Sequence, residues 1–187
     1  MSLMSESACP TEIIEFWFAP DHHALWFDST PEFDALIRRR YLATWQMARD
    51  GVLDDWRESS EGCLALVIVL DQFPLNMFRG EARCFSTEAR ARAVAQHAID
   101  RGFDKAMSVD QRAFLYIPFH HSETLEDQRF AIQLYSGPEL KDWHRGVQHH
   151  HDIVARFGRF PHRNAILGRN SGPDEIEWLK SPDAFHG

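Results

Sequence analysis

Cysteine is scarce in this sequence, and its three cysteines lack metal-ligand spacing. Cys9, Cys63 and Cys84 are odd in number and far apart. This argues against a disulfide framework and favours a reducing compartment, so we expect a cytoplasmic location. Residues 1–11 hold no basic stretch followed by an apolar core, so we expect no signal peptide. The longest strictly apolar run, residues 64–70, is far short of the roughly 20 residues that span a membrane, so we expect a soluble protein.

The signatures of several common catalytic and cofactor sites are also missing. The chain has no G-x-S-x-G nucleophile turn, no G-x-x-x-x-G-K-[ST] phosphate loop, no G-x-G-x-x-G dinucleotide motif, no EF-hand loop and no H-E-x-x-H zinc motif. We therefore expect no cofactor and no bound metal. The formal net charge of −8 argues against nucleic acid or an anionic membrane as a partner.

The pattern that is present is helical throughout. Thr30-Pro31-Glu32 has the composition of a helix start, and apolar residues at helical spacing follow it. Ser108-Val-Asp-Gln111 is a capping box that opens a helix, which Pro118 is expected to terminate. Further starts and ends of helices are indicated by Gly51, Ser86, Gly102, Thr124, Gly137, Pro138, Gly158 and Gly172.

The helices and the turns between them predict an all-α fold of antiparallel helix pairs in a compact bundle or superhelix. A length of 187 residues suits one domain, so we expect a single helical domain over residues 1–187, with an ordered core at roughly residues 10–181. Residues 64–70 are apolar and β-branched enough for a buried strand. No second strand pattern is available to pair with them, so we interpret them as a buried helix that Pro74 ends or kinks.

Polar residues stand in apolar surroundings at several places. Asp71 follows the apolar run directly, and a buried carboxylate needs a partner or becomes neutral. A structural ion pair or helix cap is one explanation, and a general base or ligand anchor is the other. His121, Ser122 and Glu123 follow Pro118, where side chains can face a cleft between helices. Capping and interior hydrogen bonding are the structural explanation here.

Histidine and arginine are concentrated toward the C-terminal end. His149, His150 and His151 are consecutive and project about 100° apart on a helix, so they cannot all bind one ion, and either His150 or His151 must fall on the apolar face. Residues 144–169 hold five arginines, one aspartate and no lysine, a net charge of +4 with neutral histidines. Such a cluster suits binding of a carboxylate or phosphate. Neutralisation of internal acids is an equally good explanation.

An ordered set of motifs runs through the chain: Glu15-Phe-Trp-Phe18, Trp26-Phe27, Phe33-Asp34, Leu70-Asp-Gln-Phe-Pro74 with Asn76 and Arg79, residues 119–123, and residues 157–164 with residues 167–169. This set resembles a bacterial family known as domain of unknown function nine-two-four. The resemblance covers roughly residues 13–179 and is most specific at residues 157–164 with residues 167–169. It implies an all-α fold similar to tetratricopeptide-like superhelices, and it implies no activity. The family pattern falls on Asp71, Gln72, Asn76, Arg79, His121, Ser122, Glu123, Gln128, Arg159, His162, Arg163, Asn164 and Arg169. Leu75 and His120 depart from the pattern, and residues 149–151 lie outside it.

Three functions are compatible with these residues. The first is a binding module whose Arg- and His-rich cleft recognises an acidic peptide or small anion through Gln72, Asn76, Arg79, Ser122, Arg159, His162, Arg163, Asn164 and Arg169. The second is an enzyme of hydrolase or lyase type, with Asp71, His121 and Glu123 in acid–base roles. The third is a buried polar network that only fixes the register of the helices. We favour the binding module, because no catalytic spacing is present.

Overall fold

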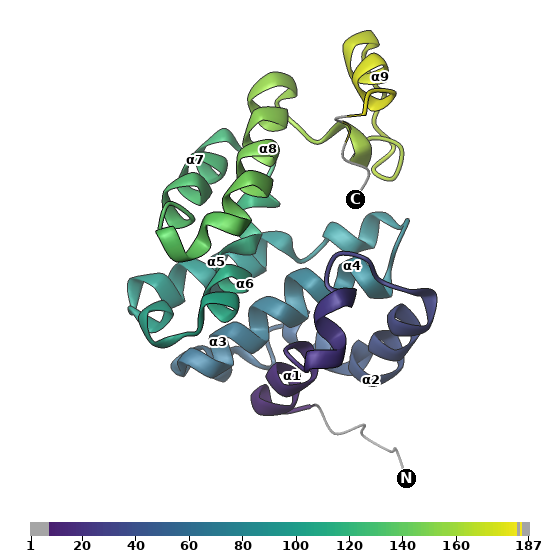
Figure 1. The fold of residues 1–187 in the computed structure, drawn as a ribbon. Helices are drawn as coiled ribbons and strands as arrows, with labels where there is room; N and C mark the ends of the chain where they lie inside the picture. Colours follow the sequence, from purple (N-terminus) through teal and green to yellow (C-terminus); the bar gives the residue numbers. More distant parts are fainter. Residues whose placement is uncertain (1–7, 183, 185–187) are drawn as a thin grey trace. The chain divides into compact units, whose positions relative to one another are not determined.

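The computed structural model describes residues 8–182 and residue 184. All regular elements in this part of the chain are helical, which confirms the all-α prediction (Figure 1). The chain divides into two compact units, described separately below. Unit 1 comprises Met1–Arg79 and Arg83–Pro118, and unit 2 comprises Gly80–Ala82 and Phe119–Gly187. The single domain and the tetratricopeptide-like superhelix stay predictions.

Unit 1 contains α1 to α5 and most of α6. These helices are α1 (Pro10–Trp17), α2 (Pro31–Arg49), α3 (Ser60–Val67), α4 (Phe73–Met77), α5 (Glu88–Asp100) and α6 (Val109–His120). Helix α3 packs against α1 and α5, while α2 packs against α4. The core between them is rich in aromatic rings. Phe73 stacks on Tyr41 with ring centroids 4.7 Å apart and meets Trp17 edge-on at 5.8 Å.

Local capping explains where several of these helices begin. The Thr30 side chain accepts a hydrogen bond from the Phe33 amide at the start of α2. Ser108 and Gln111 exchange side chain to backbone hydrogen bonds at the start of α6, as the capping box predicts. Two sequence expectations were wrong. The N-cap position of α5 is Thr87, one residue after Ser86, and its side chain makes no capping hydrogen bond. Helix α6 runs two residues beyond Pro118, because a proline near the end of a helix costs few backbone hydrogen bonds.

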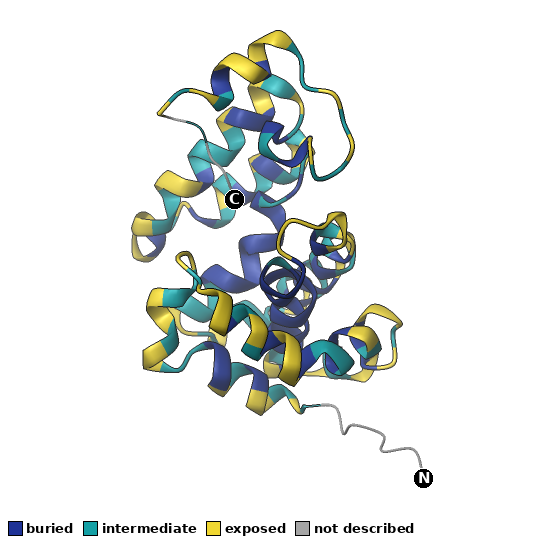
Figure 2. Cartoon of the chain, turned by 90° about the vertical axis from the view of Figure 1, so that its right-hand side faces the viewer, coloured by how far each residue is buried: buried dark blue, intermediate teal, exposed yellow. Residues whose placement is uncertain are grey.

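The apolar run at residues 64–70 is helical, as predicted, and forms the buried centre of unit 1 (Figure 2). Pro74 does not end this segment. Instead, α3 passes through a wide π-helical turn, η3 (Ile68–Gln72), directly into α4. Pro74 has no N–H to offer the Leu70 carbonyl. The Thr87 hydroxyl, at the N-cap position of α5, donates to that carbonyl at 2.5 Å. The Leu70 carbonyl therefore has a hydrogen-bond partner despite the proline.

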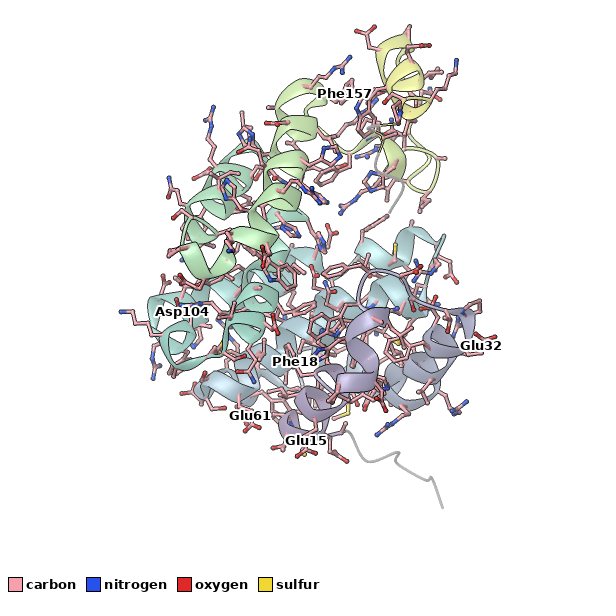
Figure 3. The ribbon with its side chains drawn as sticks, in the orientation of Figure 1. Glu15, Phe18, Glu32, Glu61, Asp104 and Phe157 are labelled. Carbon is pink, nitrogen blue, oxygen red and sulfur yellow. The ribbon has the colours of Figure 1, made fainter. Side chains whose placement is uncertain are left out.

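Unit 2 contains α7 (Leu125–Leu134), α8 (Lys141–Phe157) and α9 (Pro173–Leu179). Two short 3-10 turns, η6 (Pro138–Leu140) and η7 (Pro161–Arg163), lie before and after α8. Helices α7 and α8 pack against each other. A second small core joins Ile153, Val154, Phe160 and Trp178. Phe157, labelled near the end of α8 in Figure 3, packs on Trp178 with ring centroids 5.5 Å apart.

Glycine follows the ends of helices where the sequence predicts it, as Gly102 and Gly158 illustrate. Gly102 and Gly158 follow α5 and α8 with φ of 69° each, a backbone conformation that favours glycine. The Thr124 side chain accepts a hydrogen bond from the Asp127 amide and so caps α7. Within residues 8–182, no helix is both long enough and apolar enough to cross a lipid bilayer.

Candidate functional site

In unit 1, Asn76 and Arg79 from the motif form a polar network with Asp34. The Arg79 Nε donates to Asp34 Oδ2 at 2.7 Å, and Asn76 Nδ2 donates to Asp34 Oδ1 at 2.7 Å. The Ser29 hydroxyl also donates to Asp34, at 2.7 Å. Burial alone would raise the pKa of Asp34, but these hydrogen bonds outweigh it and hold that pKa below its ordinary value. The network ties α2 to α4, which is a structural role for Asn76 and Arg79.

Asp71 and Gln72 lie in the π-helical turn, and both side chains are buried. Gln72 Nε2 donates to Asp71 Oδ2 at 2.6 Å. The apolar run therefore continues into a carboxylate that is inside the protein, as the sequence indicated. A π turn changes the direction of side chains relative to a regular α-helix, and such turns occur frequently at functional sites. Asp71 belongs to unit 1, whereas the other two residues of the enzyme hypothesis belong to unit 2.

In unit 2, the loop between α6 and α7 is held by its own polar side chains. The Ser122 hydroxyl donates to Asp127 Oδ2 at 2.5 Å and accepts from the Thr124 amide at 3.2 Å. Buried Gln128 donates through Nε2 to the carbonyls of His120 and Ser122, at 2.8 and 2.7 Å. Ser122 and Gln128 thus fix the backbone that carries His120 and His121.

Glu123 and Arg169 are the centre of a second network. Two arginine nitrogens donate to the two oxygens of Glu123, at 2.6 and 2.8 Å, and the Phe160 amide donates to the same carboxylate at 2.8 Å. Arg169 also donates to Asn164 Oδ1 at 3.0 Å and to the Phe160 carbonyl at 3.2 Å. Although burial raises the pKa of Glu123, the hydrogen bonds from Arg169 and Phe160 hold it below the ordinary value. Glu123 is therefore a fixed, ionised carboxylate.

Arg159 has a comparable partner on α9. Its Nε and Nη2 donate to the two oxygens of Glu175 at 2.7 and 2.8 Å, and Nη2 also donates to the Asn170 carbonyl at 2.9 Å. The bonds from Arg159, with a further bond from the Gly172 amide, lower the pKa of Glu175 to about 2 despite its desolvation. Two of the arginines in the basic segment thus neutralise acids inside unit 2, as the structural explanation proposed.

A different group of side chains is linked by ring contacts and through Phe160: His120, His121, His150 and Arg163, which we call the histidine–arginine cluster. The rings of His120 and His150 are stacked, with centroids 4.9 Å apart and an interplanar angle of 15°. His121 lies 4.8 Å from His120 and 6.2 Å from His150. His150 meets the Phe160 ring edge-on at 5.4 Å, and the Arg163 guanidinium lies over that same ring at 4.7 Å.

The elements of unit 2 bring this cluster together from separate parts of the chain. His120 ends α6, and His121 follows in the loop that Gln128 holds. His150 is on α8, where its Nδ1 lies 2.8 Å from the Gly146 carbonyl one turn earlier. Arg163 belongs to η7, and its side chain is buried, as is His120, while His121 and His150 are partly exposed. His162, the neighbour of Arg163, lies 5.5 Å from the Phe160 ring.

The electrostatics of the cluster disfavour charged imidazoles. Desolvation is the main reason why the pKa of His120 lies well below its ordinary value, and electrostatic interactions with His121, His150 and Arg163 lower it further. Desolvation, with electrostatic interactions with His121, His149 and Arg163, lowers the pKa of His150 to about 3, although the Gly146 carbonyl opposes the shift. Both rings are therefore neutral at physiological pH.

This arrangement does not suit a metal ion. The stacked rings of His120 and His150 are nearly parallel, so their in-plane nitrogen lone pairs do not converge on one point. Across the residues that the structure describes, no group of three or more His, Cys, Asp and Glu side chains has the geometry to hold a metal. Neutral imidazoles beside a buried guanidinium are instead an environment in which negative charge is favourable.

Two members of the cluster, His120 and His150, are not among the site residues that the sequence predicts, because both lie outside the family pattern. Helical spacing left His150 or His151 as the residue on the apolar face, and the structure selects His150, which shares the inward stripe of α8 with the buried Val147 and Val154. Of the predicted residues, the structure brings His121 and Arg163 into the cluster. Within unit 2, the networks beside the cluster contain Ser122, Glu123, Arg159, Asn164 and Arg169. Asn76 and Arg79 lie in the Asp34 network of unit 1.

Comparison with known proteins gives the same fold without a function. Residues 13–183 match the family model described as "Bacterial protein of unknown function (DUF924)". A solved structure of a protein of unknown function from Agrobacterium tumefaciens is similar, with 41% sequence identity and a TM-score of 0.83. The match covers 91% of this chain and 96% of that one. No curated protein matches the chain.

Proposed function

The chain belongs to the DUF924 family of bacterial proteins, and on that premise we propose that it is a binding module for a small oxyanion, a carboxylate or a phosphate. The ligand contacts the histidine–arginine cluster of unit 2. Two observations carry this proposal: the rings of His120, His121 and His150 contact one another, and His150 and the Arg163 guanidinium pack on the same Phe160 ring. An anion there gains hydrogen-bond donors and a positive electrostatic environment from one compact group of side chains.

The supporting networks explain why this cluster, rather than the whole basic segment, is proposed as the site. Arg159 and Arg169 each donate two hydrogen bonds to a carboxylate, of Glu175 and Glu123. An arginine whose guanidinium already donates two hydrogen bonds to a carboxylate has few N–H groups available to bind a ligand. His121 and His150 are partly exposed, so an anion from solvent can reach them without disrupting either network. We keep the cytoplasm as the proposed location.

Isothermal titration calorimetry with sodium sulfate and with citrate tests the proposal, since these probes carry the oxygens of a phosphate-like and a carboxylate ligand. A hydrogen bond to a charged group contributes about 1.5–3 kcal/mol, so His121→Ala and His150→Ala should each weaken binding roughly 10- to 150-fold. His151→Ala is the matched control, because His151 is adjacent on α8 but contacts Asp152 and Gln148. Equal affinities in all four proteins would refute the site.

An acidic peptide presents the same carboxylate chemistry as citrate. A short polyglutamate peptide therefore forms a separate arm of the titration. Binding of the peptide but of neither small anion would identify the partner as a protein segment. Binding of sulfate or citrate, with weaker peptide binding, would identify a small molecule.

A buried carboxylate in a π-helical turn supports a second candidate, the enzyme of hydrolase or lyase type. Asp71 is the residue concerned, and Gln72 donates to it at 2.6 Å. We leave Glu123 out, because a carboxylate fixed by three hydrogen bonds is a poor proton acceptor. The Asp71→Asn variant separates the roles. An enzymatic role predicts a thermal midpoint like that of the unmodified protein, and a structural role predicts a lower one.

A further inference from the structure

Gln128, Tyr135 and His150 hold His120 in place at the end of α6. The buried Gln128 side chain donates through Nε2 to the His120 carbonyl at 2.8 Å and to the Ser122 carbonyl at 2.7 Å. The imidazole lies nearly parallel to the rings of Tyr135 and His150, with centroids 5.7 and 4.9 Å away and interplanar angles of 19° and 15°. Both the backbone and the ring of His120 are therefore fixed by neighbouring side chains of unit 2.

The Nδ1 atom of this ring is enclosed by protein. His120 as a whole is 7% exposed, and within the residues that the structure describes its Nδ1 is buried without a hydrogen-bond partner. His150 differs, since its Nδ1 meets the carbonyl of Gly146 one turn earlier on α8. The exposed fraction of His120 belongs to its other atoms, so a molecule from solvent meets the residue away from Nδ1.

The burial of Nδ1 determines the position of the ring proton. A neutral imidazole carries one N–H donor and one bare acceptor nitrogen. A proton on Nδ1 would bury an N–H group without an acceptor, and such orphaned donors are rarer inside proteins than acceptors that lack a donor. A proton on Nε2 leaves only a lone pair at Nδ1. We therefore expect the tautomer that carries its proton on Nε2.

The His120 ring can donate to an anion without a protonation step. Its pKa lies well below the ordinary value, chiefly because the ring is desolvated, so the ring is uncharged at physiological pH. An uncharged ring with its proton on Nε2 is a hydrogen-bond donor at that atom. His120 also belongs to the same cluster as the Arg163 guanidinium, to which His150 and Phe160 link it.

A fixed N–H donor in this position suits an oxyanion. Carboxylate, phosphate and sulfate oxygens accept hydrogen bonds, and a bond to an ionised acceptor is roughly twice as strong as a bond between neutral groups. A poorly solvated environment strengthens the bond further. Because the ring is already held by its neighbours, little side-chain entropy is lost when a ligand binds.

From this geometry we propose that His120 binds the oxyanion directly, as an uncharged imidazole that donates from Nε2 and keeps Nδ1 unprotonated. The inference rests on the proposed function, and it names a ring atom that selects the ligand. The ligand brings an oxygen that accepts a hydrogen bond, so a group with only N–H donors, such as an ammonium, is rejected at this atom. The bond forms with no proton gained or lost at His120.

Two amide variants separate the ring nitrogens. The side-chain nitrogen of glutamine stands two bonds beyond Cγ, as Nε2 does in histidine, whereas that of asparagine stands one bond beyond Cγ, as Nδ1 does. In calorimetric titration of the full chain with sodium sulfate at neutral pH, we expect His120→Gln to retain the affinity within about threefold and His120→Asn to weaken it roughly 10- to 150-fold. His151→Gln and His151→Asn are the matched controls, and both should bind sulfate like the unmodified protein.

Nuclear magnetic resonance of the unmodified protein measures the tautomer without a mutation. The ¹⁵N shifts of His120 should be those of a bare nitrogen at Nδ1 and of an N–H at Nε2. Addition of sulfate should shift the Nε2 proton saturably and leave Nδ1 bare. An N–H shift at Nδ1 would overturn the inference. These spectra decide the question if either His120 variant fails to fold.

The remaining outcomes separate the inference from the proposed function. Equal affinities of His120→Gln and His120→Asn for sulfate, or weaker binding by His120→Gln, would overturn the role of Nε2 and leave the anion site standing. Absence of sulfate binding by the unmodified protein would overturn the proposed function and this inference together.

Discussion

Replacement of Glu123 by glutamine should destabilise unit 2 strongly, because it removes the charge at the centre of the Arg169 network. The carboxylate accepts two hydrogen bonds from Arg169 and one from the Phe160 amide, at 2.6 to 2.8 Å. Both side chains of the pair are 25% exposed, so the guanidinium left behind is poorly solvated. Hydrogen bonds to charged groups contribute about 1.5–3 kcal/mol each but are not additive. We therefore expect Glu123→Gln to lower the free energy of unfolding by about 2–3 kcal/mol.

Thermal unfolding followed by circular dichroism measures this effect. A loss of that size should lower the midpoint by roughly 4–12 °C in a protein of this length. The matched control is Glu177→Gln, since Glu177 faces Lys180 at 3.7 Å in a pair that is 83% and 68% exposed, and the change there should stay within about 0.5 kcal/mol. A double-mutant cycle with Arg169→Gln adds the coupling energy. Additive effects of Glu123→Gln and Arg169→Gln would refute the network.

The remaining predictions concern unit 1 and the histidines. Thr87→Val removes the donor to the Leu70 carbonyl, so we expect the free energy of unfolding, measured in urea, to fall by about 1–2 kcal/mol. An unchanged urea midpoint would contradict this prediction. Asp34→Asn keeps the shape of the side chain but weakens the bonds from Asn76 and Arg79. We expect Asp34→Asn to lower the free energy of unfolding by about 1–2 kcal/mol in the unmodified protein, and to have no such effect in a protein that already carries Arg79→Gln. The pKa of His150 is lower in the folded state than in the unfolded chain, so unfolding takes up a proton below about pH 6.5. Stability should therefore fall as the pH decreases from there toward 3, and His150→Phe should flatten that slope in acid-unfolding curves.

The local structure of this protein was largely predictable from the sequence. Thr30, Ser108 and Thr124 cap helices as expected, because capping involves residues only three positions apart. Helix α1 was not predicted, since its eight residues are too few to establish a helical period. The π-helical turn also escaped prediction. Pro74 leaves the Leu70 carbonyl without its helical donor, and the hydroxyl that bonds this carbonyl instead belongs to Thr87, 17 positions further along the chain.

The candidate site was predictable in its residue types but not in its pairing. The basic segment contains the arginines that the structure uses, yet Arg169 reaches Glu123 across 46 positions and Arg159 reaches Glu175 across 16. No sequence spacing encodes such partners. The run of three histidines is a partial success, since helical spacing narrowed the inward residue to His150 or His151 and the structure selects His150. No sequence pattern indicated that the His150 ring stacks on His120.

Nuclear magnetic resonance of the histidine side chains, during titration of the unmodified protein with sodium sulfate at about pH 6, tests the anion site most directly. We predict saturable changes at His121 and His150, with His151 and the exposed His23 unaffected. Shifts that increase without saturation, or that are equal at all histidines, would show that the histidine–arginine cluster binds no anion.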